Sequence, residues 1–193
     1  MTFLFRNDRN YIQGSDFFLY IQNFLKKRKF QSLNLICKEF INTEPKIKIL
    51  SHSEKDKAYP LNYSVICIIK MRKNFFCITF KNSKKKILKN KPYDDKLFYP
   101  NFNASEKTAK CNFSTHFKDI EILIALTKFW HEKKIKKKGK WIFTRLNLIK
   151  PFSNKMRKNF KIKITNNKFN KYTLSNVIQN KQKIGEIHFT LIN

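Results

Sequence analysis

The sequence predicts an α+β fold, in which a small mixed sheet packs on one long helix and an N-terminal helical hairpin precedes both. Three observations predict this fold. Residues 117–130 carry apolar side chains at helical spacing, residues 63–80 hold two apolar runs of strand length, and 41% of the chain is hydrophobic. Disordered chains lack this apolar content, so a packed core is expected.

The segment from Ser114 to Lys150 reads as a helix, a basic turn and a strand. The buried face of the helix is expected to consist of residues spaced by three and four, namely Phe117, Ile120, Leu123, Ile124, Thr127 and Trp130. Ser114 or Thr115 is expected to cap its start, and Gly139 to stop it after a run of lysines. Residues 141–149 are rich in aromatic and β-branched side chains and predict a strand.

The N-terminal part predicts two amphipathic helices, starting at Gly14 and at Ser32, the second of which ends before Pro45. We interpret residues 1–60 as a helical extension and residues 61–193 as a basic α/β RNA-binding domain. In that domain the sequence predicts an antiparallel meander, a loop over 90–113, later strands, and a short helix at 172–179. The predicted strands are residues 63–70, 75–80, 85–89, 141–149, 160–165 and 184–192.

The charge of the chain is strongly positive, with 42 Lys and Arg against 13 Asp and Glu and a formal net charge of +29. A folded body with this charge usually has a polyanionic partner, most often a nucleic acid. Lys, Asn, Ile and Phe, which AT-rich codons encode, dominate the composition. We therefore expect an organelle-encoded protein of the mitochondrial matrix. No run of apolar residues is long enough for a membrane-spanning helix.

Signatures of enzymes are scarce. Only Gly14, Gly139 and Gly185 are glycines, which excludes glycine-rich phosphate loops, and the four histidines are isolated from one another. Cys37, Cys67, Cys77 and Cys111 lack the close pairing of a zinc site, so they are expected to act as small buried hydrophobes. We predict no enzymatic activity, no metal and no cofactor.

Basic residues cluster at almost every junction between predicted elements, and lysine outnumbers arginine, which suits phosphate neutralisation better than base reading. The segments 133–140 and 81–91 are expected to be the main phosphate anchors. The predicted RNA-binding residues are Lys70, Arg72, Lys73, Lys84, Lys85, Lys86, Lys107, Lys110, Lys133, Lys134, Lys136, Lys137, Lys138, Lys140, Arg145, Lys155, Arg157 and Lys158.

Part of the chain resembles a known family. The run Val65-Ile-Cys-Ile-Ile-Lys70, with Asn74 ahead of the next strand, is similar to the first hairpin of small-subunit ribosomal protein eleven. Lys107 to Thr115 resembles the basic entry to its helix, and residues 141–149 the strand after that helix. The resemblance covers residues 61–165, but the family's glycine-rich pieces and its C-terminal tail are absent.

The resemblance and the charge together imply a structural constituent of the small subunit of the mitochondrial ribosome. Its partners would be ribosomal RNA and, through residues 1–60 and 90–113, neighbouring ribosomal proteins. An alternative is an accessory subunit of an organellar membrane complex, held at the surface by basic amphipathic helices. A third class, a nuclease or maturase, would need clustered carboxylates for a metal, which the sequence does not show.

Overall fold

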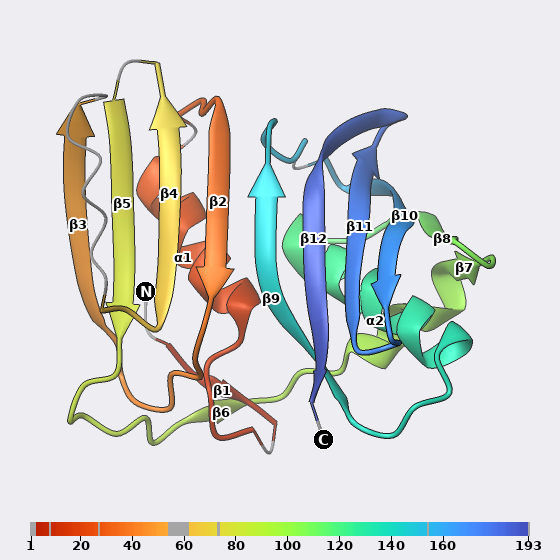
Figure 1. Ribbon diagram of the computed structural model, residues 1–193, viewed down its shortest axis with the longest axis horizontal. Coiled ribbons are helices and arrows are strands. Elements are labelled where there is room, and N and C mark those ends of the chain that lie inside the picture. Colours follow the sequence, from red (N-terminus) through yellow and green to blue (C-terminus); the bar gives the residue numbers. More distant parts are fainter. Residues whose placement is uncertain are drawn as a thin grey trace. The chain divides into compact units, whose positions relative to one another are not determined.

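The computed structural model describes residues 3–7, 9–26, 28–53, 62–72, 74–153 and 155–192. It divides into two compact units, Met1–Tyr93 (unit 1) and Asp94–Asn193 (unit 2). Each unit contains an antiparallel sheet and one α-helix (Figure 1). The predicted boundary at residue 60 lies outside the described residues, and the units divide after Tyr93.

Unit 1 has a sheet with the strand order β3-β5-β4-β2, in which all neighbours pair antiparallel. The helix α1 packs on this sheet through aromatic rings, and the ring centroids of Phe17 and Phe80 lie 4.9 Å apart. A short parallel pair, β1 with β6, ties the start of the unit to its end. The elements are β1 (Phe5–Arg6), α1 (Gly14–Leu25), β2 (Ser32–Cys37), β3 (Lys46–Ser53), β4 (Val65–Met71), β5 (Asn74–Lys81) and β6 (Asn90–Lys91).

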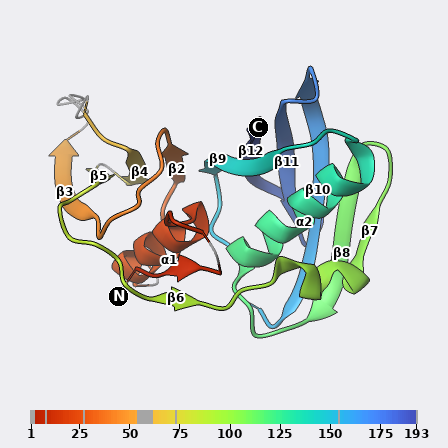
Figure 2. The ribbon, with the colours of Figure 1, turned by 90° about the horizontal axis from the view of Figure 1, so that it is seen from below.

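Unit 2 has a larger sheet with the order β9-β12-β11-β10-β8-β7, again with antiparallel neighbours. Its helix α2 lies on the inner side of the curved sheet (Figure 2). The elements are the 3-10 helix η1 (Asp95–Asn101), β7 (Phe102–Ala104), β8 (Thr108–Ser114), α2 (Asp119–Lys134), β9 (Lys140–Leu148), β10 (Arg157–Lys168), β11 (Tyr172–Gln179) and β12 (Gln182–Ile192).

The helix α2 is buried around its whole circumference, because every residue from Asp119 to Thr127 is buried. The sequence predicts a single apolar face, whereas the structure surrounds the helix. Beyond the predicted face, Ile122, Ala125 and Leu126 are also buried, so the first half of the helix lies within the core. Its start also differs from the prediction, since Lys118 rather than Ser114 or Thr115 is the capping residue.

The predicted fold class is wrong. The structure is mostly β, and the N-terminal hairpin of helices does not exist, because residues 32–37 form β2. Leu33 and Leu35 are buried there with a period of two, and the strand pairs with β4. The predicted helix at 172–179 is also wrong, because this segment is β11, between β10 and β12.

Several other elements match the prediction. The strands β4, β5, β9, β10 and β12 and the helices α1 and α2 cover the expected segments. The third strand of the predicted meander is instead β3, which pairs with β5, while residues 85–89 contribute one isolated bridge, from Lys86 to Thr43. Gly139 does not stop the helix. It precedes β9 at a φ of 130°, where a Cβ atom would lie 2.6 Å from the carbonyl oxygen of Ile192.

Tight turns in this chain use residues other than glycine at positive φ. The left-handed C-cap of α1 is Lys26, with a φ of 42°. Further non-glycine residues with positive φ are Asn7, Arg72, Phe169, Asn170, Asn180 and Lys181. Apart from asparagine, such residues favour negative φ, so the turns at Lys26, Arg72, Phe169 and Lys181 store strain.

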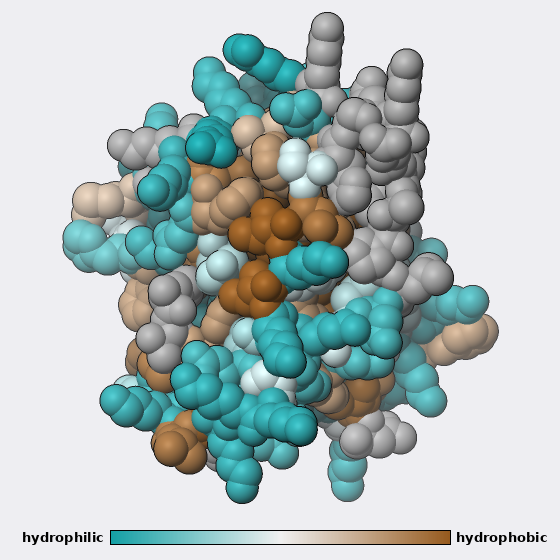
Figure 3. Space-filling view, turned by 90° about the vertical axis from the view of Figure 1, so that its left-hand side faces the viewer, coloured by the Kyte–Doolittle hydropathy of each residue, from teal (hydrophilic) through white to brown (hydrophobic). Residues whose placement is uncertain are grey.

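The side of unit 1 that carries the edge strand β3 shows hydrophobic residues between hydrophilic ones (Figure 3). Among the exposed large apolar residues of this unit are Phe40 and Ile49, exposed to 46% and 42%. In the described part of the chain, no helix has the length and apolar character needed to cross a membrane.

Candidate functional site

The outer face of the unit 2 sheet carries a regular pattern of lysine and asparagine. In β10 the residues Phe160 and Ile162 point into the core, while Lys161 and Lys163 are exposed. In β8 the same alternation buries Cys111 and exposes Lys110. Because side chains alternate along a strand, the exposed residues of both strands share one face of the sheet.

The register between the strands sets two lysines side by side. Lys110 of β8 lies directly opposite Lys161 of β10, and Asn103 of β7 lies on the far side of Lys110. One step along the same face, Asn112 lies opposite Asn159. The structure therefore builds a row of two ammonium groups beside a row of two amides.

These rows border a hollow of about 360 Å³ on the surface, which we call the β8–β10 hollow. Its volume lies at the small end of the range for ligand pockets. The turn between β11 and β12 adds a third lysine at its rim. The lining residues are Asn101, Asn103, Lys110, Cys111, Asn112, Asn159, Phe160, Lys161, Ile178 and Lys181.

The electrostatics of the hollow favour an anion. Among the described residues that line it, none is acidic. Like charges directly opposite each other on neighbouring strands destabilise a sheet, so the pair Lys110 and Lys161 is unfavourable in the absence of a ligand. Arg157 adds a guanidinium group at the edge, where its Nε donates to Oδ1 of Asn112 at 2.8 Å.

The predicted RNA-binding residues of unit 1 are not part of this hollow. Lys70 is the last residue but one of β4, with its ammonium group 5.4 Å from the ring centroid of Phe75. Arg72 is in the following turn, while Lys73 lies outside the described residues. Lys84, Lys85 and Lys86 are exposed in the segment after β5, and Lys85 forms an ion pair with Glu44 at 2.6 Å.

In unit 2 the predicted residues fall into separate places. Lys110 lines the hollow and Arg157 borders it. Lys158 faces the opposite way: it is 4% exposed and its ammonium group lies 2.9 Å from Oδ1 of Asp119, so an external phosphate does not reach it. Elsewhere lie Lys107 before β8, Lys133 and Lys134 at the end of α2, Lys136, Lys137, Lys138 and Lys140 around the start of β9, Arg145 in β9, and Lys155 before β10.

Sequence reasoning missed Lys161, Lys181 and the asparagines of the hollow. The sequence does contain a signal for Lys161. In the run Phe160-Lys-Ile-Lys-Ile-Thr165 apolar and polar residues alternate, so both lysines lie on one face of the strand. The neighbouring strand β8 falls in the predicted loop 90–113, so the pairing of Lys110 with Lys161 was not visible in the sequence.

Nucleophilic thiol chemistry is not supported by the cysteines. Cys67 and Cys77 are buried in strands, as predicted. Burial raises the pKa of Cys37 to about 12 and that of Cys111 to about 11. Both thiols are therefore protonated near neutral pH, and a protonated thiol is a poor nucleophile. No group of potential metal ligands occurs in the part of the chain that the structure describes.

Two histidines of unit 2 form polar contacts away from the hollow. His131 is buried and its Nε2 lies 2.8 Å from the hydroxyl oxygen of Thr173. His188 lies on the outer face, with its Nδ1 at 2.5 Å from the hydroxyl of Tyr172. Burial and then the charge of Arg145 lower the pKa of His188, so its imidazole is neutral near pH 7.

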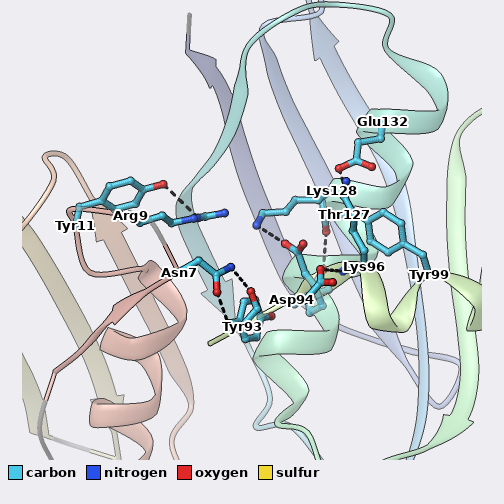
Figure 4. A network of polar contacts seen from close by, with 12 residues as sticks. Asn7, Arg9, Tyr11, Tyr93, Asp94, Lys96, Tyr99, Thr127, Lys128 and Glu132 are labelled. Carbon is cyan, nitrogen blue, oxygen red and sulfur yellow. Dashed lines mark hydrogen bonds and ion pairs between the residues drawn. The ribbon is translucent and has the colours of Figure 1, made fainter. Parts of the chain in front are cut away.

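Further polar contacts fix the segment that follows β6 (Figure 4). In unit 1 the amide of Asn7 hydrogen-bonds to the backbone of Tyr93, accepting from its N–H at 2.7 Å. In unit 2 Lys128 forms an ion pair with Asp95 at 2.6 Å. The hydroxyl of Tyr99 donates to Glu132, and burial raises the pKa of this tyrosine. These contacts are structural, because each charged group is occupied by a partner.

Comparison with known proteins gives a structural likeness but no match in sequence. No family model and no curated protein sequence matches the chain. A crystal structure of an acyl-ACP thioesterase from Bacteroides thetaiotaomicron is similar, with a TM-score of 0.46, 8% identity, and coverage of 100% of this chain and 96% of that chain.

These findings correct the predicted function. The ribosomal structural protein and the non-enzyme were predicted for an α+β domain, whereas the fold is mostly β, so both predictions are wrong. The alternative prediction, a subunit of a membrane complex, is also wrong. It required two basic amphipathic helices, and the second of these segments is the strand β2. The resemblance to small-subunit ribosomal protein eleven, the RNA partner and the mitochondrial location are untested and stay predictions.

Proposed function

We propose that unit 2 binds a phosphorylated ligand of nucleotide size in the β8–β10 hollow. The observation that carries the proposal is the directly opposed pair Lys110 and Lys161, in a hollow whose described lining contains no acidic residue. Two opposed ammonium groups are unfavourable alone and become favourable when an anion lies between them. Lys181 at the rim supplies a further donor for a second phosphate group.

The asparagines of the hollow favour a nucleotide over a simpler anion. Asn101, Asn103, Asn112 and Asn159 each carry a donor and an acceptor, although Oδ1 of Asn112 already accepts from Arg157. Amides of this kind recognise base edges and sugar hydroxyls. Inorganic phosphate would use only the lysines, and a neutral sugar only the asparagines. A nucleoside diphosphate uses both.

The apolar part of the lining suits the same ligand class. The side chain of Ile178 lies beside Lys161 in the neighbouring strand β11. An aliphatic side chain at the edge of a polar pocket offers a surface against which the flat face of a base can pack. A hollow of about 360 Å³ accommodates one nucleotide and not a folded polymer.

Isothermal titration calorimetry of the full chain with ADP, adenosine and inorganic phosphate tests the proposal. We expect ADP to bind more tightly than either fragment, and added salt to weaken it. Lys161→Gln removes one charge-assisted contact, so it should weaken ADP binding about tenfold or more. The matched control is Lys136→Gln, another exposed lysine of unit 2 that is outside the lining, which should leave the affinity within about twofold.

Two outcomes would overturn the proposal. One is equal loss of affinity in both variants, which would assign the binding to net charge. The other is much tighter binding of a single-stranded oligonucleotide than of ADP, with a steep salt dependence, because a polymer then contacts many lysines and not one hollow.

A further inference from the structure

A second surface of unit 2 combines one exposed aromatic ring with several lysines. It is formed by the turn between β10 and β11 and by the segment before β9. We define this surface, the basic tip, as Lys136, Lys137, Lys138, Lys168, Phe169 and Lys171, all of which are exposed. It is independent of the β8–β10 hollow, whose lining contains none of these residues.

Phe169 is held in an unusual backbone conformation. The N–H of Lys171 donates to the carbonyl oxygen of Lys168 at 3.0 Å, which closes a turn with φ values of 54° at Phe169 and 50° at Asn170. Positive φ at both central residues is the geometry of a type I′ turn, which favours Asn and Gly. A phenylalanine at this position is therefore strained by its backbone.

Among the described residues of unit 2, the side chain of Phe169 finds little packing that would offset this strain. It is 76% exposed, and the one ring interaction shown for it is a lysine ammonium, Lys168 Nζ, at 5.8 Å from the ring centroid. A strained residue with an exposed apolar ring is poorly explained by folding stability. Strain of this kind concentrates at functional positions, and here it presents the ring to a partner.

The surroundings of the ring are uniformly basic. The ammonium group of Lys137 donates to the carbonyl oxygen of Phe169 at 2.6 Å, which fixes the lysine segment before β9 against the turn. Between Glu132 and Glu186 the sequence contains no aspartate and no glutamate. A partner that complements both features presents negative charge beside a region into which the ring can insert.

We infer that the basic tip binds an anionic lipid surface, with Phe169 inserted below the headgroups. Lysines near an anionic bilayer each contribute favourably, and their aliphatic stems extend along apolar surroundings while the ammonium groups stay at the headgroups. Stable membrane attachment takes two signals, and an apolar insertion beside a basic patch supplies both. Single-stranded nucleic acids instead use grooves with successive aromatic platforms, whereas the tip presents one ring.

Sedimentation of the full chain with lipid vesicles tests this inference. We expect binding to phosphatidylcholine vesicles that contain about 30% phosphatidylserine, and little to phosphatidylcholine alone. Phe169→Asn should weaken binding to the anionic vesicles about tenfold or more. Asparagine is favoured in this turn, so thermal unfolding followed by circular dichroism should show an unchanged or higher melting temperature and exclude misfolding.

Two control variants separate the contributions. Met156→Asn removes another exposed apolar side chain, 57% accessible and before the start of β10, and should not change vesicle binding. Lys168→Gln combined with Lys171→Gln should weaken vesicle binding by about tenfold or more. Lys110→Gln combined with Lys161→Gln should instead reduce ADP binding and change vesicle binding much less.

The inference is overturned if Phe169→Asn binds anionic vesicles as well as the unaltered chain does, or if neutral vesicles bind equally. It is also overturned if vesicles do not bind while a single-stranded oligonucleotide binds and depends on Phe169, because the tip is then a nucleic-acid surface.

Discussion

The imidazole ring of His131 lies parallel to the indole ring of Trp141, with the ring centroids 3.7 Å apart and the planes inclined by 10°. His131 is fully buried near the end of α2, and Trp141 belongs to β9, so this stack joins the helix to the sheet. No described residue serves as a partner for Nδ1 of His131. Burial lowers the pKa of this histidine from 6.5 to about 3.

Because of this pKa shift, the free energy of unfolding depends on pH. In the unfolded chain His131 takes up a proton below pH 6.5, whereas in the folded chain it stays neutral down to about pH 3. The contribution of the histidine is therefore fully present above pH 6.5 and is lost as the pH falls from 6.5 towards 3. The slope from this group approaches about 1.4 kcal/mol per pH unit.

His131→Phe should remove this pH dependence, because the ring stack is retained and the titrating group is not. Urea unfolding at several pH values between 4 and 7, compared between the two chains, measures the difference, which should be about 3 kcal/mol over this interval. Parallel curves would show that His131 does not titrate with folding.

A charge reversal in the β8–β10 hollow should separate stability from binding. Lys161→Glu sets a carboxylate directly opposite Lys110 and replaces repulsion by attraction. We expect the free energy of unfolding to rise by about 0.5–1 kcal/mol and ADP binding to be lost. Urea unfolding and calorimetry on the same preparation check both. Retained ADP binding would contradict the assigned site.

The buried ion pair of unit 1 should be costly to break. Nη2 of Arg6 lies 2.6 Å from Oδ1 of Asp16, with the side chains exposed to only 0% and 4%, and Lys91 approaches the same oxygen at 3.3 Å. Asp16→Asn leaves the buried guanidinium without a carboxylate, so the free energy of unfolding should fall by about 3–5 kcal/mol.

A double variant is the control for this loss. Arg6→Met combined with Asp16→Leu removes both charges and should recover most of the stability in urea unfolding, since apolar replacements for a buried pair are often neutral. If the single variant costs less than about 1 kcal/mol, water reaches the guanidinium and the pair is not desolvated.

The sequence predicts the central helix and the strands that have strong apolar runs. It misleads where one segment fits both the helical period and the alternating period of a strand. In residues 32–37 both a helical and an alternating pattern place Leu33 inside, and only the pairing with β4 selects the strand. In β11 the buried side chains include the polar Thr173 and Ser175, while Leu174 is half-buried on the outer face. Hydrophobic pattern alone cannot recover such a strand.

The candidate site depends on contacts that are distant in sequence. The exposed lysines of β10 are visible as an alternating run, yet their partner Lys110 lies about 50 residues earlier, in a segment without a clean period. Lys158 shows the opposite error, because a basic cluster suggests exposure whereas the strand register turns this side chain inward, onto Asp119.

The shortage of glycine in the turns has a consequence for how the protein responds to its environment. Non-glycine residues at positive φ, such as Lys26, Arg72 and Lys181, each cost on the order of 1 kcal/mol of native-state stability. Summed over several turns, this brings the chain closer to its unfolding threshold than its core would suggest. Near that threshold, any ligand that binds only the folded state changes the folded population measurably. The fraction of chains that are folded then rises with the fraction of binding sites that are occupied, so the abundance of the protein would follow the concentration of its ligand.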